Sequence, residues 1–193
     1  MTLASKITLF RLFLAPVFAV MAVYYGETVK AGMPDERLRW WAVGIFIFAS
    51  ASDALDGYVA RRYGQRSKFG AFMDPFADKT LLLTGIVFLT FVPWGDGSHI
   101  PIWFTALMII RDIIIIGGIW ILHYFNSHVP IRPHWTGKVC TVTQMVLLGW
   151  VMLKFDPHFL IYPTIAATIF TLWSGIEYFR QGLHMLHDHD HDV

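Results

Sequence analysis

Residues 53–79 read DALDGYVARRYGQRSKFGAFMDPFADK, and they place four aspartates, Asp53, Asp56, Asp74 and Asp78, in a chain that is otherwise strongly apolar. An acidic side chain at the centre of a bilayer costs about 2.5–3.5 kcal/mol on insertion scales, so four together need a positive partner. The stretch therefore indicates a cation site within a membrane protein.

The spacing of the aspartates predicts two consecutive helices with facing acidic stripes. At about 100° per residue, Asp53 and Asp56 fall on one side of a first helix. Asp74 and Asp78 are four residues apart, so they share one stripe of a second helix. The same stripes carry three small residues, Gly57 and Ala60 on the first helix and Gly70 on the second.

The expected ligands are carboxylate oxygens, with no cysteine or histidine among them. Hard oxygen ligands favour Mg²⁺ or Mn²⁺ over zinc or copper.

With this spacing the stretch resembles the class I CDP-alcohol phosphotransferases. The pattern of that family is D-x2-D-G-x2-A-R-x8-G-x3-D-x3-D. It is matched position for position by Asp53, Asp56, Gly57, Ala60, Arg61, Gly70, Asp74 and Asp78.

The resemblance implies transfer of a substituted phosphoryl group from a CDP-linked donor to an alcohol, with release of CMP. Two divalent ions about 4 Å apart would neutralise the diphosphate and orient the reacting oxygens. Asp53, Asp56 and Asp74 are then metal ligands, and Asp78 is the general base and a further contact to the metal. The implied nucleotide and diphosphate site is Asp53, Gly57, Ala60, Arg61 and Gly70.

Two of these assignments have a purely structural alternative. Small residues such as Gly57, Ala60 and Gly70 also serve close helix packing in membranes. Arg61 also serves as a positive anchor on the cytoplasmic side.

Composition places the whole chain in the membrane class. Of 193 residues, 55% are hydrophobic and 15% charged, which is typical of a polytopic membrane protein with one domain. The net charge of +1 argues against a nucleic-acid partner. The single cysteine, Cys140, excludes an intrachain disulfide.

Apolar periodicity predicts an all-α fold with six transmembrane helices. They are expected at about 7–25, 40–62, 70–92, 100–125, 137–155 and 159–185. The start of the first, SKITLFR, is expected along the membrane interface, and a secretory signal peptide is the less favoured alternative. A polar linker from Glu27 to Arg39 would join it to the second helix.

The charges of the loops predict the orientation of the chain. Arg61, Arg62, Arg66 and Lys68 mark their loop as cytoplasmic, so the motif opens to the cytoplasm and both termini lie there. We expect an inner (plasma) membrane of a bacterium. The terminal LHDHDHDV is interpreted as a solvated end and not as a metal site.

Three basic residues outside the motif are candidates to hold a phosphate of the acceptor: Arg111, Arg132 and Lys138. Arg111 precedes Asp112 in the middle of the fourth expected helix, so mutual neutralisation and contact with a phosphate both remain open. Lys138 begins the fifth helix, where backbone N–H groups also favour an anion.

Two branches of the family share features with the chain. ITLFRLFLAPVF, DPFADK and SGIEYF resemble bacterial phosphatidylglycerophosphate synthases, which implies CDP-diacylglycerol as donor and glycerol 3-phosphate as acceptor. Arg111-Asp112, and PHWTGKVCT with Cys140 where a lysine is common, resemble cardiolipin synthases, whose acceptor is phosphatidylglycerol. The first branch is favoured. The resemblance also implies a homodimer in membrane lipid.

A divalent-cation transporter is the alternative from another class, because carboxylates within a membrane also mark ion paths. Transporters often repeat their halves and hold their acids near the midplane. The sequence shows no such repeat and places its acids beside one basic loop. These features favour the enzyme.

Overall fold

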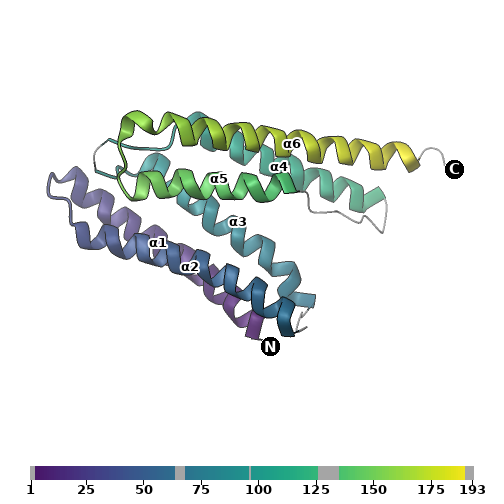
Figure 1. Cartoon of the computed structure of the whole chain (residues 1–193), viewed down its shortest axis with the longest axis horizontal. Coiled ribbons are helices and arrows are strands. Elements are labelled where there is room, and N and C mark those ends of the chain that lie inside the picture. Colours follow the sequence, from purple (N-terminus) through teal and green to yellow (C-terminus); the bar gives the residue numbers. More distant parts are fainter. Residues whose placement is uncertain (1–2, 64–67, 96, 126–134, 190–193) are drawn as a thin grey trace. The chain divides into compact units, whose positions relative to one another are not determined.

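The computed structural model describes the backbone of residues 3–63, 68–95, 97–125 and 135–189. It describes the side chains of residues 10, 12–52, 79–95, 97–118 and 135–181. Within these residues the regular structure is entirely helical, which confirms the all-α class (Figure 1). The elements are α1 (Leu3–Lys30), α2 (Glu36–Tyr63), α3 (Lys68–Phe91), α4 (Ile102–Phe125), α5 (Trp135–Met152), the 3₁₀ turn η1 (Pro157–Phe159) and α6 (Ile161–His189).

The expected polar linker between the first two helices is mostly helical, which corrects the prediction. α1 continues to Lys30, where Lys30 pairs with Glu27 at 2.8 Å. α2 begins at Glu36 because Asp35 caps it: the backbone N–H of Arg37 donates to the Asp35 carboxylate at 2.9 Å.

Both ends of the chain are more helical than expected. α1 is a single helix from Leu3 with Pro16 inside it, so SKITLFR does not form a separate helix. α6 runs to His189, so the first part of the His/Asp tail is helical.

The chain divides into two compact units, the first made of Met1–Ile100 and Leu148–Pro157, the second of Pro101–Leu147 and His158–Val193. In the first unit α1 packs along both α2 and α3, which contact each other much less. Phe18 of α1 and Phe46 of α2 are both buried, with ring centroids 5.6 Å apart. The core of this unit is therefore centred on α1.

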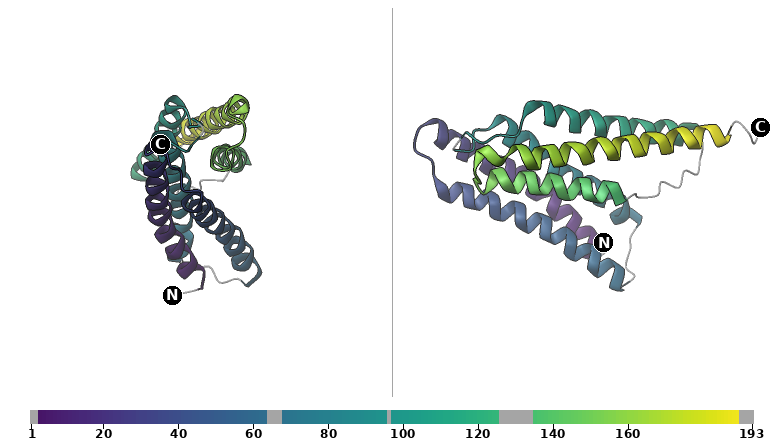
Figure 2. Two further views of the ribbon diagram at one scale, coloured as in Figure 1. Left: turned by 90° about the vertical axis from the view of Figure 1, so that its left-hand side faces the viewer. Right: turned by 45° about the horizontal axis from the view of Figure 1, so that its top comes forward.

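In the second unit α4 and α6 run side by side (Figure 2). Phe104 and Met108 of α4 and Ala167 of α6 are buried. Three buried polar side chains join α5 to α6. Gln144 Nε2 donates to Thr171 Oγ1 at 3.2 Å, and Cys140 Sγ lies 3.4 Å from the same oxygen. Hydrogen bonding thus satisfies these polar side chains within an apolar core.

Two segments among the described residues are long and apolar enough to cross a bilayer, Leu12–Lys30 and Pro157–Gln181. A shorter apolar stretch is Lys79–Phe91. Large apolar side chains are exposed on these and other helices, including Ile113, Ile169 and Trp173. Six membrane-spanning helices stay a prediction.

Candidate active site

The eight motif residues lie on two helices of the first unit that follow each other in the chain. Asp53, Asp56, Gly57, Ala60 and Arg61 belong to the second half of α2, whereas Gly70, Asp74 and Asp78 belong to the first half of α3. Only four residues separate Tyr63 from Lys68, so these two helix ends are at most about 19 Å apart. The helical placement of the motif is confirmed. Its side chains lie outside the described residues, so the facing of the acidic stripes stays a prediction.

Beyond the motif, the side chains of Leu148 and of Phe46 in α2 approach α3 closely at Gly85. Gly85 of α3 lies where an added Cβ would be 3.1 Å from Leu148 Cδ2 and 3.3 Å from Phe46 Cε2. Leu148 is fully buried, as is Leu89 of α3 one turn further on. The absence of a side chain at Gly85 thus lets the side chains of Leu148 and Phe46 pack against α3.

The second unit holds Arg111, the first candidate for the acceptor phosphate. Its Nη1 pairs with Asp112 Oδ1 at 2.6 Å, which agrees with mutual neutralisation, one of the two interpretations that the sequence left open. Its Nη2 donates to Ser174 Oγ at 2.5 Å, and its guanidinium lies 5.9 Å from the centroid of the Tyr178 ring. α4 and α6 therefore fix the head of Arg111 together.

Sequence analysis did not predict a role for Ser174 or Tyr178. Both lie in the segment SGIEYF, which was noted only for its resemblance to one branch of the family. Gly175, between them, makes room for the arginine: a Cβ there would be 3.3 Å from Arg111 Cγ. Arg111 Nε is buried without a hydrogen-bond partner among the described residues. The Nε–H donor is thus enclosed by the protein and makes no hydrogen bond to the described residues.

The first turn of α5 approaches the same tyrosine. A Cβ at Gly137 would be 3.3 Å from Tyr178 Oη. Lys138 follows and is exposed, while the Thr136 hydroxyl is buried without a hydrogen-bond partner in the described part of the chain. Tyr178 thus links Arg111 to the start of α5, and the N–H groups of a first helical turn favour an anion. Arg132 lies outside the described residues.

A family model described as CDP-alcohol phosphatidyltransferase matches residues 1–175. The chain belongs to this family. The match extends through both helices of the motif and through the Arg111 cluster as far as Gly175. The protein is therefore an enzyme of the CDP-alcohol phosphatidyltransferase type, as the aspartate pattern predicted.

Individual relatives are similar over most of their length. The chain is 34% identical over 183 residues to the CDP-diacylglycerol–glycerol-3-phosphate 3-phosphatidyltransferase of Escherichia coli (strain K12), covering 90% of this chain and 91% of the relative. The protein of that name from Shigella sonnei (strain Ss046) shows the same identity and coverage. A probable phosphatidylglycerophosphate synthase of Mycobacterium tuberculosis (strain ATCC 25618 / H37Rv) is 33% identical over 185 residues, covering 94% of this chain and 81% of the relative.

Cys140, one feature that resembled the cardiolipin branch, is buried in this family member. Its thiol contacts Thr171 and also accepts from Gln144 Nε2 at 3.4 Å. The position therefore contributes to the packing of α5 on α6 and brings no positive charge to the second unit.

Proposed function

We propose that this chain transfers the phosphatidyl group of CDP-diacylglycerol to glycerol 3-phosphate, forming phosphatidylglycerophosphate and CMP. The similarity to the Escherichia coli relative carries the proposal, because it extends over nine-tenths of both chains. A match of this length extends far beyond the 26 residues of the aspartate motif.

The reaction exchanges one phosphorus–oxygen bond for another. A hydroxyl oxygen of glycerol 3-phosphate attacks the phosphorus that carries the diacylglycerol, and its proton passes to a base. The bond from this phosphorus to the oxygen of the CMP phosphate breaks, and CMP leaves with the electron pair. We assign the base to Asp78, and the contacts to the nucleotide and diphosphate to Asp53, Gly57, Ala60, Arg61 and Gly70.

The donor set of the motif fits hard divalent cations, since Asp53, Asp56, Asp74 and Asp78 offer only carboxylate oxygens. Mg²⁺ or Mn²⁺ held there would neutralise the diphosphate and stabilise the charge of the leaving CMP. The proposed site gathers like charges, and a cation held there would remove their mutual repulsion.

For the acceptor phosphate we propose Lys138, Arg132 and Arg111. Lys138 is exposed on the first turn of α5, where its ammonium and the backbone N–H groups can hold one anion. Arg111 already pairs with Asp112, which offsets much of its charge. Its role would therefore be to donate a hydrogen bond to the phosphate and not to supply an unpaired positive charge.

The membrane arrangement is part of the proposal. Six helices would span the bilayer, with the motif loop and both termini in the cytoplasm and with two chains forming a homodimer. Met33, between α1 and α2, is 81% exposed and would then lie outside. A Met33→Cys variant in a Cys140→Ser background should react with an impermeant thiol reagent in intact cells.

The decisive experiment supplies the purified protein with CDP-diacylglycerol and Mn²⁺ or Mg²⁺, and with glycerol 3-phosphate or phosphatidylglycerol. Lipid products are identified by mass spectrometry, and an Asp74→Asn variant purified in parallel controls for contaminating enzymes. We expect phosphatidylglycerophosphate and an equal amount of CMP. Cardiolipin as the main product would favour the other branch. Uptake of Mn²⁺ into vesicles without release of CMP would indicate a transporter.

A further inference from the structure

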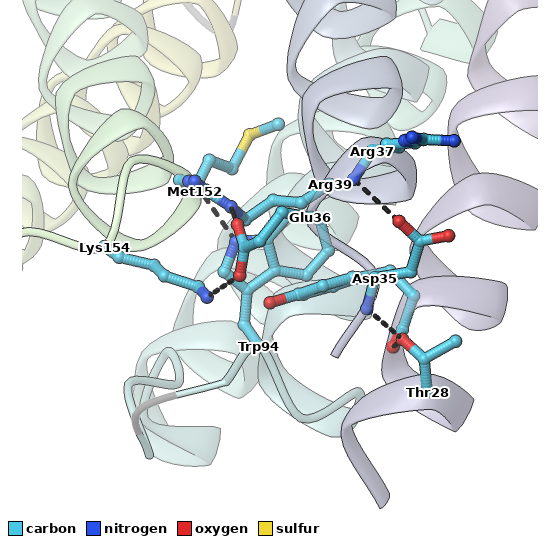
Figure 3. Close-up of polar contacts among 9 residues, drawn as sticks. Thr28, Asp35, Glu36, Arg37, Arg39, Trp94, Met152 and Lys154 are labelled. Carbon is cyan, nitrogen blue, oxygen red and sulfur yellow. Dashed lines mark hydrogen bonds and ion pairs between the residues drawn. The ribbon is translucent and has the colours of Figure 1, made fainter. Parts of the chain in front are cut away.

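The end of the first unit away from the motif carries a polar cluster that ties the two acid-bearing helices to one atom. The main-chain carbonyl of Met152 accepts a hydrogen bond from Arg39 Nη1 and another from Trp94 Nε1, each at 3.2 Å (Figure 3). Arg39 lies in the first turn of α2, and Trp94 follows the end of α3 by three residues. We call Arg39, Trp94 and the Met152 carbonyl the Met152 clamp.

Both donors of the Met152 clamp are held by further contacts. Arg39 is only 8% exposed, pairs with Glu36 and stacks over the Trp40 ring with its Cζ 4.6 Å from the centroid. Trp94 is fully buried, with its ring edge-on to that of Tyr25 at 4.8 Å. Few arginines are so deeply buried without a structural or functional reason, because an unpartnered buried cation is strongly destabilising.

The turn after α5 directs the Met152 carbonyl to these donors. The N–H of Lys154 donates to Val151 and that of Phe155 to Trp150, both at 3.1 Å, which is the Schellman pattern of a helix end. These bonds use the carbonyls before Met152, and the Met152 carbonyl receives the two side chains.

Lys154 occupies the left-handed position of this turn, with φ +54°, where glycine is usual. Its side chain explains the exception, because Nζ pairs with Glu36 Oε1 at 2.6 Å. A glycine, Gly95, faces the Lys154 side chain. Its φ is +113°, and a Cβ there would be 2.8 Å from Lys154 Cε. Lys154 thus fixes the turn against the first residue of α2.

The position of this cluster matters because α2 and α3 contact each other little along their lengths. Their relative axial position therefore depends on α1 and on the Met152 clamp. Asp53 and Asp56 follow Arg39 by 14 and 17 residues, which is about 21–26 Å along a helix at 1.5 Å per residue. A shift of α2 along its axis at Arg39 would reach these aspartates almost undiminished, because a helix resists compression.

We infer that Arg39 and Trp94 are positioning residues for phosphatidyl transfer: by binding one carbonyl, they set the axial register of α2 against α3 and so the spacing of the motif carboxylates. The inference rests on the proposed function. It predicts that loss of either donor impairs the chemical step although the clamp lies at the end of α2 away from the motif.

The test compares Arg39→Gln and Trp94→Phe with two matched controls. Trp94→Phe keeps an aromatic ring and removes the N–H donor together with part of the buried indole. Arg37→Gln and Trp41→Phe make closely matched changes at exposed positions of α2. Each variant is assayed for kcat and for KM of both substrates. In parallel, spin labels on cysteines at Ile47 of α2 and Leu83 of α3, both exposed, report the distance between the helices in a Cys140→Ser background.

We expect kcat of Arg39→Gln and Trp94→Phe to fall by roughly tenfold to a hundredfold, because about 1 Å of misplacement can cost that much. KM should stay unchanged, and the distance distribution should shift or broaden, while both controls behave as the unmodified chain. Normal kcat in folded variants would overturn the inference. A lower kcat with unchanged label distances would also overturn it.

Two further outcomes are separable. If Arg39→Gln does not fold, as judged by gel filtration in detergent, Trp94→Phe decides alone. If the unmodified chain fails to use glycerol 3-phosphate, the proposed function is lost. In that case the inference is tested by two other measurements, the distance between the spin labels and the affinity for Mn²⁺ from the EPR signal of the ion. If Trp94→Phe changes neither quantity relative to the unmodified chain, the inference is rejected.

Discussion

Lys154 and Glu36, 118 residues apart in the chain, form an ion pair of 2.6 Å between Nζ and Oε1. The hydrogen bond from Lys154 is the main cause that lowers the pKa of Glu36; burial opposes it, and Arg39 adds to it. Burial by itself would lower the pKa of Lys154, but the neighbouring Glu36 carboxylate and Tyr25 hydroxyl outweigh it, and the pKa is raised. Both groups are therefore charged at neutral pH.

This pair makes stability depend on pH at both extremes. The contribution of Glu36 is fully present above its ordinary pKa of 4.5 and is lost as pH falls through the lowered pKa of the folded state. The contribution of Lys154 is fully present below 10.5 and is lost as pH rises through its raised pKa. Between these limits the pair should stabilise the first unit at a constant level.

We predict that Lys154→Met lowers the thermal midpoint at neutral pH, with a modest loss of about 0.2–1 kcal/mol because the Glu36 side chain is 46% exposed. The difference from the unmodified chain should shrink below pH 4.5. Thermal unfolding in detergent, followed by tryptophan fluorescence, measures it. Lys30→Met, which removes an exposed pair within one helix, is the control. An equal difference at acid and neutral pH would contradict the assignment.

A second prediction concerns the packing of α1 on the end of α3. An added Cβ at Gly26 would clash with Val92 Cγ1, whereas a Cβ at Gly44 would meet nothing within 4 Å. Gly26→Ala should therefore destabilise the protein by about 1–3 kcal/mol, the usual cost of overpacking. Gly44→Ala is the matched control and should be neutral or slightly stabilising, since alanine favours helix. Equal thermal midpoints for the two variants would contradict the prediction, because they would mean that a methyl group at position 26 fits beside Val92.

The helices could largely be predicted from the sequence, because long apolar runs and a family pattern determine them. α3 and α4 begin and end within two residues of their expected limits. The start of α2 was missed because Glu36, Arg37 and Arg39 looked like solvated charge. Only contacts from distant segments, Met152 and Lys154, show why charges can begin a helix there.

The site could be predicted only in part. The motif fixes which helices carry the aspartates, and the adjacent Arg111 and Asp112 suggested their own pairing. Ser174 and Tyr178 could not be assigned, because their contact with Arg111 depends on how α6 packs against α4. Trp94 lies between two expected helices, 70–92 and 100–125, where no buried residue was predicted, yet it is fully buried in the first unit.

A third prediction tests the roles within the motif. Asp53→Asn, Asp56→Asn and Asp74→Asn should each abolish turnover while the protein stays folded, since each removes a ligand charge without creating a cavity. Asp78→Asn should retain more binding of Mn²⁺ and nucleotide but lose transfer steeply. Binding of Mn²⁺ by EPR and turnover measured on the same samples separate the two classes. Equal losses of binding and rate in Asp78→Asn would make Asp78 mainly a ligand.

The last prediction separates the two acceptors by charge. Glycerol 3-phosphate carries nearly two negative charges on a small molecule, so its binding must depend on cations, whereas phosphatidylglycerol offers one charge and two acyl chains. Lys138→Gln or Arg132→Gln should raise KM for glycerol 3-phosphate by roughly tenfold or more, taking about 1.5–3 kcal/mol for a charge-assisted hydrogen bond. KM for CDP-diacylglycerol should change little. Arg37→Gln is the control, because it removes an exposed cation at the end of α2 away from the motif. It should leave both KM values unchanged. If neither variant alters KM for glycerol 3-phosphate, these two residues do not hold its phosphate. If the unmodified enzyme turns over only phosphatidylglycerol, the cardiolipin branch replaces the proposed acceptor.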